Sequence, residues 1–177
     1  METKKTWIIA DTHFNHDNII ICEKRPFNSK EEMNETIIKL WNETVAPYDI
    51  VYHLGNVIFG DKMIKDGILK QLNGYKILRL GNLDKRTIMN QWKQYFDEVY
   101  EDDILLDDLC LSHLPLSKYE MDRLLALGLI KGNVHGHLHS QKSNLEQTKY
   151  KCVSAKLTNF RPIAFEEVKK YFGIGMN

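Results

Sequence analysis

The chain has 177 residues, of which 43% are hydrophobic and 27% charged, and 24 Lys and Arg residues balance 24 Asp and Glu residues. A length near the ~150 residues of a typical domain predicts a single domain over residues 1–177. Because the net charge is zero, no broad positive field is available to hold a nucleic-acid polymer or an anionic membrane. Both partner classes are disfavoured, and an anionic substrate must be held locally.

The sequence shows neither a targeting segment nor a redox motif. Its apolar runs, such as residues 7–10, are far shorter than the roughly 20 residues of a membrane span, and the first residues lack the apolar stretch of a signal peptide. Cys22, Cys110 and Cys152 are odd in number and far apart, which matches neither a disulfide framework nor a CxxC site. We therefore expect a soluble, cytoplasmic protein with reduced cysteines.

The first half alternates short apolar runs with segments of helical periodicity. Ser29 and Glu32 have the spacing of a capping box at a helix N-terminus. The pattern predicts strands at residues 7–10, 50–54 and 76–80 and helices at residues 30–45, 61–72 and 85–96. Taken alone, this alternation favours a parallel sheet covered by helices, with ligands at the C-terminal ends of the strands.

The second half is richer in strands. The pattern predicts strands at residues 103–106, 108–112, 131–135 and 150–154 and helices at residues 116–127 and 163–172. The polar segment 140–148 is expected to be a loop. No internal repeat or linker interrupts the chain, which agrees with one domain.

Five of the predicted strands are followed by residues that can bind a metal ion. These are Asp11-Thr12-His13, Gly55-Asn56, Gly81-Asn82-Leu83-Asp84, Ser112-His113 and Gly136-His137-Leu138-His139. Their nitrogen and oxygen donors suit borderline divalent ions. His137 and His139 are two residues apart, so on an extended segment they project to the same side and can serve two adjacent ions. Two ions ~3.5–4 Å apart clamp a phosphoryl group and supply a metal-bound hydroxide, so the set indicates a hydrolase.

The five motifs, in this order over about residues 6–155, resemble the calcineurin-like metallophosphoesterase family. Residues 11–14 and 52–55 resemble its small, single-domain bacterial and phage members. The resemblance implies a four-layer α/β/β/α sandwich of two mixed β-sheets flanked by helices, which replaces the single parallel sheet favoured above. It also implies a centre of two divalent ions, Mn first, with Fe, Zn or Ni as alternatives.

Carried over by position, the resemblance implies two ligand sets. Asp11, His13 and His139 would bind the first ion, Asn82, His113 and His137 the second, and position 56 would bridge the two. The family has an aspartate at the bridge, whereas this chain has Asn56. Because an amide offers one neutral oxygen in place of two anionic ones, we expect weaker metal loading, especially at the second position. Asn56 marks an inactivated or degenerate site, unless Gly55-Asn56 is only a turn.

Leu83 stands where the family has a histidine that protonates the leaving group. General-acid help is worth ~10²–10⁴-fold, so we expect a preference for esters with acidic leaving groups, or another proton donor. His16 and His53 are the candidates, and His16 is favoured because it follows His13 closely, although it could be an exposed loop histidine. Asp84 is expected to support catalysis by orienting the turn or a neighbouring histidine.

Arg25 and Asn82 are the predicted contacts to substrate. The guanidinium fork of Arg25 can bind two phosphate oxygens, or the side chain can be a solvated surface arginine. The neutral charge and small size favour a small, nucleotide-like phosphodiester or phosphomonoester over a polymer. Because the sequence leaves no length for a large capping domain, we expect the site to be open unless a loop closes over it or a homodimer completes it.

The leading hypothesis is therefore a metal-dependent phosphoesterase, either a phosphodiesterase or a phosphatase, impaired by Asn56. The alternative is a catalytically inactive protein of the same fold that binds or sequesters a phosphorylated ligand. The substitution Asn56→Asp discriminates between the two, because it restores the bridging carboxylate.

Overall fold

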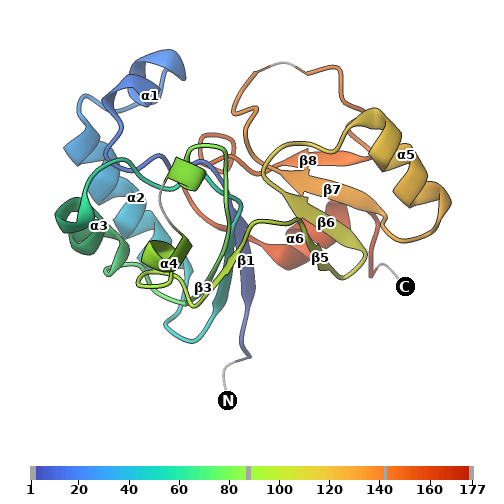
Figure 1. Cartoon of the computed structure of the whole chain (residues 1–177), viewed down its shortest axis with the longest axis horizontal. Helices are drawn as coiled ribbons and strands as arrows, with labels where there is room; N and C mark the ends of the chain where they lie inside the picture. Colours follow the sequence, from blue (N-terminus) through green and yellow to red (C-terminus); the bar gives the residue numbers. More distant parts are fainter. Residues whose placement is uncertain (1–2, 87–88, 142, 176–177) are drawn as a thin grey trace.

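The computed structural model describes residues 3–86, 89–141 and 143–175 (Figure 1). Its strands are β1 (Thr6–Ile9), β2 (Ile50–His53), β3 (Tyr75–Arg79), β4 (Glu98–Tyr100), β5 (Ile104–Leu106), β6 (Leu109–Ser112), β7 (Gly132–His135), β8 (Tyr150–Cys152) and β9 (Ile163–Ala164). Its α-helices are α1 (Asp17–Cys22), α2 (Lys30–Thr44), α3 (Lys62–Leu69), α4 (Met89–Trp92), α5 (Lys118–Ala126) and α6 (Phe165–Tyr171). Among the described residues, no helix is long and apolar enough to cross a membrane.

The strands form two sheets, and both are mixed. The first has the order β4-β3-β2-β1-β9, with four parallel strands and β9 antiparallel beside β1. The second has the order β5-β6-β7-β8, with β5 antiparallel to β6 and the other strands parallel. Ile9 pairs with His53, and His53 pairs with Leu78, so the carboxyl ends of β1, β2 and β3 lie level.

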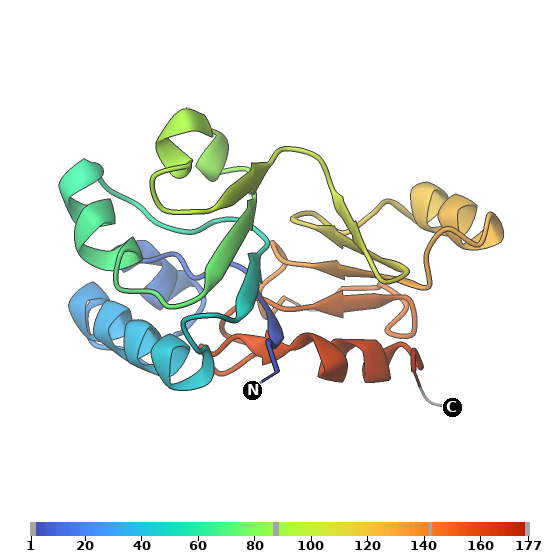
Figure 2. The ribbon, with the colours of Figure 1, turned by 90° about the horizontal axis from the view of Figure 1, so that it is seen from below.

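Helices cover the outer faces of the two packed sheets (Figures 1 and 2). Successive side chains of a strand point to opposite faces, so Ile8 of β1 joins the core between the sheets while Ile9 joins the core under α2 and α3. Met121 of α5 packs with Cys110 on the outer side of the second sheet. The predicted four-layer α/β/β/α sandwich is confirmed. Helix α6 adds to the central core, where Phe165 and Val168 are buried.

The sequence prediction missed three short elements and mistook one helix. Strand β4 is only three residues long and precedes an acidic run, and β9 is two residues inside the segment predicted as helix 163–172. Helix α1 contains three successive isoleucines, which are weaker helix formers than Ala or Leu, and so escaped prediction. The predicted helix 85–96 is instead a 3-10 turn at Asp84–Arg86 followed by the short α4; residues 87–88 of that prediction lie outside the described chain.

The predicted N-terminal cap of α2 forms, with one difference. The hydroxyl of Ser29 accepts a hydrogen bond from the Glu32 amide at 3.1 Å. The Glu32 carboxylate, however, accepts from the backbone and side-chain nitrogens of Asn28 rather than from Ser29. A reciprocal capping box is found at Ser117 and Glu120 instead, where it starts α5.

Candidate metal centre

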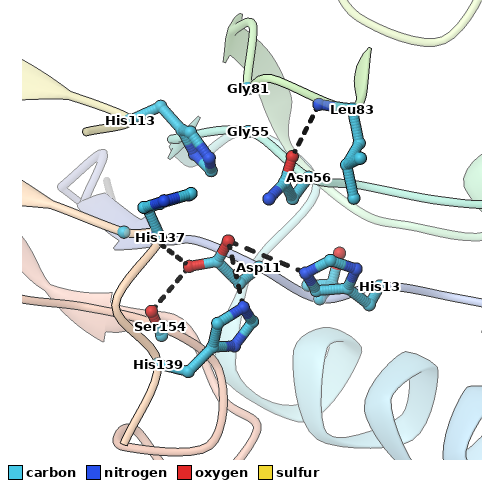
Figure 3. Close-up of polar contacts among 12 residues, drawn as sticks. Asp11, His13, Gly55, Asn56, Gly81, Leu83, His113, His137, His139 and Ser154 are labelled. Atoms are coloured by element: carbon cyan, nitrogen blue, oxygen red, sulfur yellow. Dashed lines mark hydrogen bonds and ion pairs between the residues drawn. The ribbon is translucent and has the colours of Figure 1, made fainter. Parts of the chain in front are cut away.

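The carboxyl ends of the parallel strands in both sheets meet at one junction. The backbone joins the sheets there, because Ala10 pairs with Ser154 after β8, with Ala10 N–H donating to the carbonyl of Val153 at 3.0 Å. All seven residues predicted as metal ligands follow strands that end at this junction, and Figure 3 labels all of them except Asn82. They are Asp11, His13, Asn56, Asn82, His113, His137 and His139.

Asp11, His13 and His139 form the tightest group of donors at the junction. One donor atom from each lies within 4.8 Å of the others, and Asp11 Oδ1 is 3.8 Å from His13 Nε2 and 4.0 Å from His139 Nε2. Asp11 Oδ1 and both ring nitrogens of His13 are buried without a hydrogen-bond partner among the described residues. Buried polar atoms are rarely left unpaired. Ligand atoms about 2 Å from one ion lie about 3–4 Å from each other, so a divalent ion fits this group.

The carboxylate of Asp11 is held in one orientation. Its Oδ2 accepts hydrogen bonds from the Ser154 hydroxyl at 2.6 Å and from the His137 amide at 2.8 Å, which leaves Oδ1 facing the imidazoles (Figure 3). Burial raises the pKa of Asp11 to about 7, although these two bonds and the charge of Arg25 act in the opposite direction. Sequence reasoning missed Ser154, whose one signal is its place at the end of a predicted strand.

The histidines of the junction are held in the neutral form that binds metal. Burial lowers the pKa of His13 well below its ordinary value and lowers the pKa of His113 and of His139 to about 4. Burial also lowers the pKa of His137. Because a protonated imidazole has no free lone pair, these shifts favour cation binding at neutral pH.

A second group of donors lies beside the first, around His113. Its Nδ1 is 2.7 Å from the Leu54 carbonyl oxygen, which places the proton on that nitrogen and the lone pair on Nε2. Nε2 lies 2.8 Å from Asn82 Oδ1, and the ring of His137 packs edge-on against that of His113 at 5.2 Å. The donor set suits a divalent ion, but unlike the first group it contains no carboxylate.

Asn56 lies between the two groups, and its amide is bound within the protein (Figure 3). Its Oδ1 accepts a hydrogen bond from the Leu83 amide at 3.1 Å, and its Nδ2 donates to Asn82 Oδ1 at 3.2 Å. Leu83 thus contributes a backbone N–H, while its side chain has no proton to donate. One neutral oxygen that already accepts a hydrogen bond is a poor substitute for a bridging carboxylate.

Glycines allow the loops to approach this closely. A Cβ added to Gly81 would lie 2.6 Å from both the amide nitrogen and Oδ1 of Asn56, and one added to Gly55 would lie 2.3 Å from the nitrogen of Gly81. A Cβ on Gly136 would lie 2.6 Å from Asp11 Oδ2. Gly55 and Gly81 are therefore required by the approach of backbone atoms, and Gly136 by the approach of the Asp11 carboxylate.

The backbone at the donors is strained. Five of the seven predicted ligands have left-handed φ angles: Asp11 (54°), His13 (50°), Asn56 (56°), His137 (64°) and His139 (50°). Such a conformation costs a non-glycine residue on the order of 1 kcal/mol and persists where the surrounding structure enforces it, often at functional sites. These donors are five of the eleven non-glycine residues with a positive φ in the described part of the chain.

Asp84 organises the backbone between the two groups. It is 3% exposed, and its Oδ2 accepts from the amides of Asn56 at 2.6 Å and Gly81 at 2.8 Å, while Oδ1 accepts from the amide of Val57 at 3.0 Å. Burial raises its pKa. These contacts fit the predicted orienting role and leave no free oxygen facing a substrate.

The structure corrects the prediction that Arg25 binds substrate phosphate. Its side chain is buried, 4% exposed, and its two terminal nitrogens donate to the carbonyl oxygens of Asp11 and Thr12, each at 2.8 Å. Burial lowers its pKa to about 10, so the group stays charged at neutral pH. The sequence alone could not distinguish a guanidinium group exposed at the surface from one that is hydrogen-bonded to backbone carbonyls of its own chain.

Of the two candidate proton donors, His16 is the one at the centre. Its ring stacks on Phe59 at 4.0 Å and lies 5.5 Å from the ring of His13, and it is partly exposed. His53 is instead buried and hydrogen-bonded to the Thr12 hydroxyl and the Gly55 amide, so it has no access to a substrate. Sequence reasoning missed Phe59, which orients His16 and carries no motif signal.

Comparison with known proteins establishes a shared fold and no activity. No family model matches the chain. The uncharacterized protein MJ1445 of Methanocaldococcus jannaschii is 47% identical over 87 residues, which are 48% of this chain and 49% of that protein. The match thus spans about half the length of that curated relative.

Two solved structures are similar. A protein of unknown function, AQ665 from Aquifex aeolicus, has a TM-score of 0.76 and 28% identity, and the match covers 95% of this chain and 99% of that one. An uncharacterized protein from Streptococcus pneumoniae, described as a predicted phosphoesterase, has a TM-score of 0.37 and 14% identity over 87% of this chain and 72% of that one. The first protein shares the fold of this chain. The second is too dissimilar in structure to support a conclusion about this chain.

Proposed function

We propose that this chain is a metal-dependent phosphoesterase that acts on a small phosphodiester or phosphomonoester. The observation that carries the proposal is the buried carboxylate oxygen of Asp11, unpartnered among the described residues and facing the imidazoles of His13 and His139. A carboxylate and two neutral imidazoles are a ligand set of hydrolytic metal sites. The His113 group adjoins it, as two-ion phosphoester hydrolysis requires.

The residues have distinct roles in this proposal. When bound, the divalent ions stabilise negative charge on phosphoryl oxygens and make water a better nucleophile. One ion would be held by Asp11, His13 and His139. The other would be held less tightly by Asn82, His113 and His137, because Asn56 brings no negative charge. Asp84 and Ser154 orient the donors. His16, held against Phe59 at the partly exposed side, gives a proton to the leaving oxygen in place of the histidine that Leu83 replaces.

The proposed substrate is nucleotide-like and short. The chain has a net charge of zero, so the phosphate is bound by the local ions rather than by a positive surface. Asn82 is exposed at the centre and remains the candidate for a direct contact to the phosphate. Mn²⁺ is the proposed ion, with Fe, Zn and Ni as alternatives of similar ligand preference.

One observation favours a second candidate, a binding protein without turnover. Both polar atoms of the Asn56 amide are engaged inside the protein, by Leu83 and Asn82. A centre with this amide in place of a carboxylate would still bind a phosphate ester, but it would lack the negative charge that supports hydrolysis. In that case the protein sequesters a phosphorylated ligand.

The test compares the chain with its Asn56→Asp variant on two aryl esters, bis-p-nitrophenyl phosphate and p-nitrophenyl phosphate, with Mn²⁺. These leaving groups need little protonation, so Leu83 does not mask activity. We expect Mn²⁺-dependent hydrolysis that rises in the variant, and the ratio of the two substrates separates diesterase from phosphatase. Chelation by EDTA should abolish the rate in both proteins.

The double variant Asn56→Asp with Leu83→His decides between the two candidates. It restores both the carboxylate and the proton donor, so an enzyme should become faster on alkyl as well as aryl esters. If this variant binds Mn²⁺ and remains inert on all of them, the protein is a binding protein rather than a phosphoesterase.

A further inference from the structure

The segment directly after α1, residues 23–25, lies between two of the loops that carry metal donors. Helix α1 is anchored by Ile19, which is 7% exposed, and the turn is closed by the Arg25 amide, which donates to the Ile20 carbonyl at 2.9 Å. Lys24 at the corner has a left-handed φ of 48° and is exposed. The two residues flanking it, Glu23 and Arg25, are therefore buried on the inner side.

Arg25 is bound to the backbone of the first loop. Its guanidinium fork spans two consecutive carbonyl groups, those of Asp11 and Thr12. In an extended chain, successive carbonyl groups point to opposite sides. Here the carbonyls of Asp11 and Thr12 both point to Arg25, and the backbone departs from the extended form, with left-handed φ angles at Asp11 and His13. A planar fork with parallel N–H donors matches such a pair, whereas an ammonium group does not.

Glu23 is bound to the backbone of the other loop. Its Oε2 accepts from the hydroxyl of Ser140 at 3.0 Å and from the amide of Ser140 at 3.5 Å, and Ser140 directly follows His139. Lys156 completes the contact, because its Nζ donates both to the backbone carbonyl of Glu23 and, at 3.2 Å, to the Ser140 hydroxyl. Two residues of one turn, Glu23 and Arg25, thus reach both loops that supply the Asp11, His13 and His139 donors.

We propose that Glu23 and Arg25 are positioning residues that set the geometry of the first metal-binding group by holding its two loops at a fixed separation. The inference rests on metal binding by Asp11, His13 and His139, as proposed above. Neither residue needs to touch the ion or the substrate. Partners one step removed from the ligands affect metal affinity because they fix ligand orientation.

The experiment measures metal affinity and ligand geometry rather than hydrolysis. Four variants are compared with the unaltered chain: Arg25→Lys, which keeps the charge and loses the fork; Glu23→Ala; Glu23→Gln, which keeps an acceptor for Ser140; and Lys24→Ala, the exposed control between them. Each is titrated with Co²⁺, whose visible absorption reports coordination geometry, and with Mn²⁺ by calorimetry. Circular dichroism of each metal-free protein measures its folding.

We expect Arg25→Lys and Glu23→Ala to bind the first ion about 10–100-fold more weakly and with an altered Co²⁺ spectrum. Glu23→Gln and Lys24→Ala should match the unaltered chain. A purely structural role predicts the opposite, namely a lower melting temperature with unchanged affinity and spectrum in the folded protein, and that result overturns the inference. If Arg25→Lys does not fold, Glu23→Ala decides, since the partner that it loses, Ser140, is exposed. Failure of the unaltered chain to bind any ion refutes the proposed function itself.

Discussion

In the candidate metal centre, the amide oxygen of Asn82 lies 2.8 Å from Nε2 of His113. Burial lowers the pKa of His113 to about 4, and its Nδ1 carries the one ring proton toward Leu54, so at neutral pH Nε2 has none to share. The orientation of the Asn82 amide follows from Asn56, whose Nδ2 donates to the same oxygen. Two lone pairs thus face each other, an arrangement that a cation bound by both atoms makes favourable.

This contact leads to a prediction about metal stoichiometry. The unaltered chain should bind one ion tightly, at the Asp11 group, and a second one weakly at His113 and Asn82. Asn56→Asp adds a negative charge between the two positions and should strengthen the second binding event by about one to two orders of magnitude. Calorimetric titration with Mn²⁺ and elemental analysis measure both constants. Asn90→Asp, an exposed position on α4, is the charge control. Two equally tight ions in the unaltered chain would contradict this account.

A second prediction concerns proton donation by His16. His16→Gln should lower hydrolysis of alkyl phosphate esters by ~10²–10⁴-fold and leave p-nitrophenyl esters nearly unchanged. Burial and the charge of Arg25 lower the pKa of His16, so the rate on alkyl esters should rise as the pH falls toward that pKa, as long as metal stays bound. Steady-state rates on the two ester classes test this. An equal loss on both would show that His16 serves binding rather than proton transfer.

A third prediction compares two glycines. Gly81→Ala places a Cβ against the backbone and amide of Asn56 and should destabilise the protein by about 1–3 kcal/mol and weaken metal binding. Gly67 lies in the middle of α3 with no atom within 4 Å of an added Cβ, so Gly67→Ala should stabilise by about 0.5–1 kcal/mol and leave metal binding intact. Urea unfolding with and without Mn²⁺ measures both. Similar effects of the two substitutions would exclude a special role for close approach at Gly81.

A fourth prediction concerns acid stability. His53 is buried, its Nε2 donates to the Thr12 hydroxyl at 2.9 Å, and burial lowers its pKa from 6.5 to about 3. Between these values the unfolded chain binds a proton at this residue that the folded chain does not. The stability that comes from keeping His53 neutral is therefore fully present above pH 6.5. As the pH decreases from 6.5 to about 3, the free energy of unfolding falls by about 1.4 kcal/mol per pH unit.

The check is urea unfolding of the metal-free protein across that window, in parallel with His53→Gln. Glutamine has no titrating group, so unfolding of the variant should take up about one proton fewer. The pH dependence of its unfolding free energy should be correspondingly weaker, while the contributions of the other buried histidines are retained. An unchanged slope would mean that His53 is protonated in the folded protein as well.

The sequence predicted the parts of the fold that depend on local pattern. The pattern correctly placed the strands that end before Asp11, Gly55 and Gly81, and it placed the N-terminal cap of α2 at Ser29. Periodicity and capping are local properties and can therefore be recognised in the sequence. Helix α1 and strands β4 and β9 were missed, because their conformation is decided by contacts with distant segments. Two sheets rather than one were expected from the family resemblance, not from periodicity.

At the candidate site, the sequence identified the residues by chemical type and not by contact. The donors meet because they follow strands whose carboxyl ends are level, which the motif order indicates. Three contacts depend on tertiary geometry. They are the burial of the Arg25 guanidinium against the backbone, the hydrogen bond from Ser154 to Asp11 and the stacking of Phe59 on His16. No residue type or spacing signals these contacts in a single sequence.

The left-handed conformations at the donor residues have a consequence for how an ion enters. Contacts within the chain, such as those of Arg25 with the carbonyls of Asp11 and Thr12, hold these conformations, so we expect the loops to be ordered before an ion arrives and little chain entropy to be lost on binding. Metal-free and metal-bound proteins should therefore superimpose closely at these loops. The speed of ion exchange would then be limited by removal of water from the ion rather than by rearrangement of the protein.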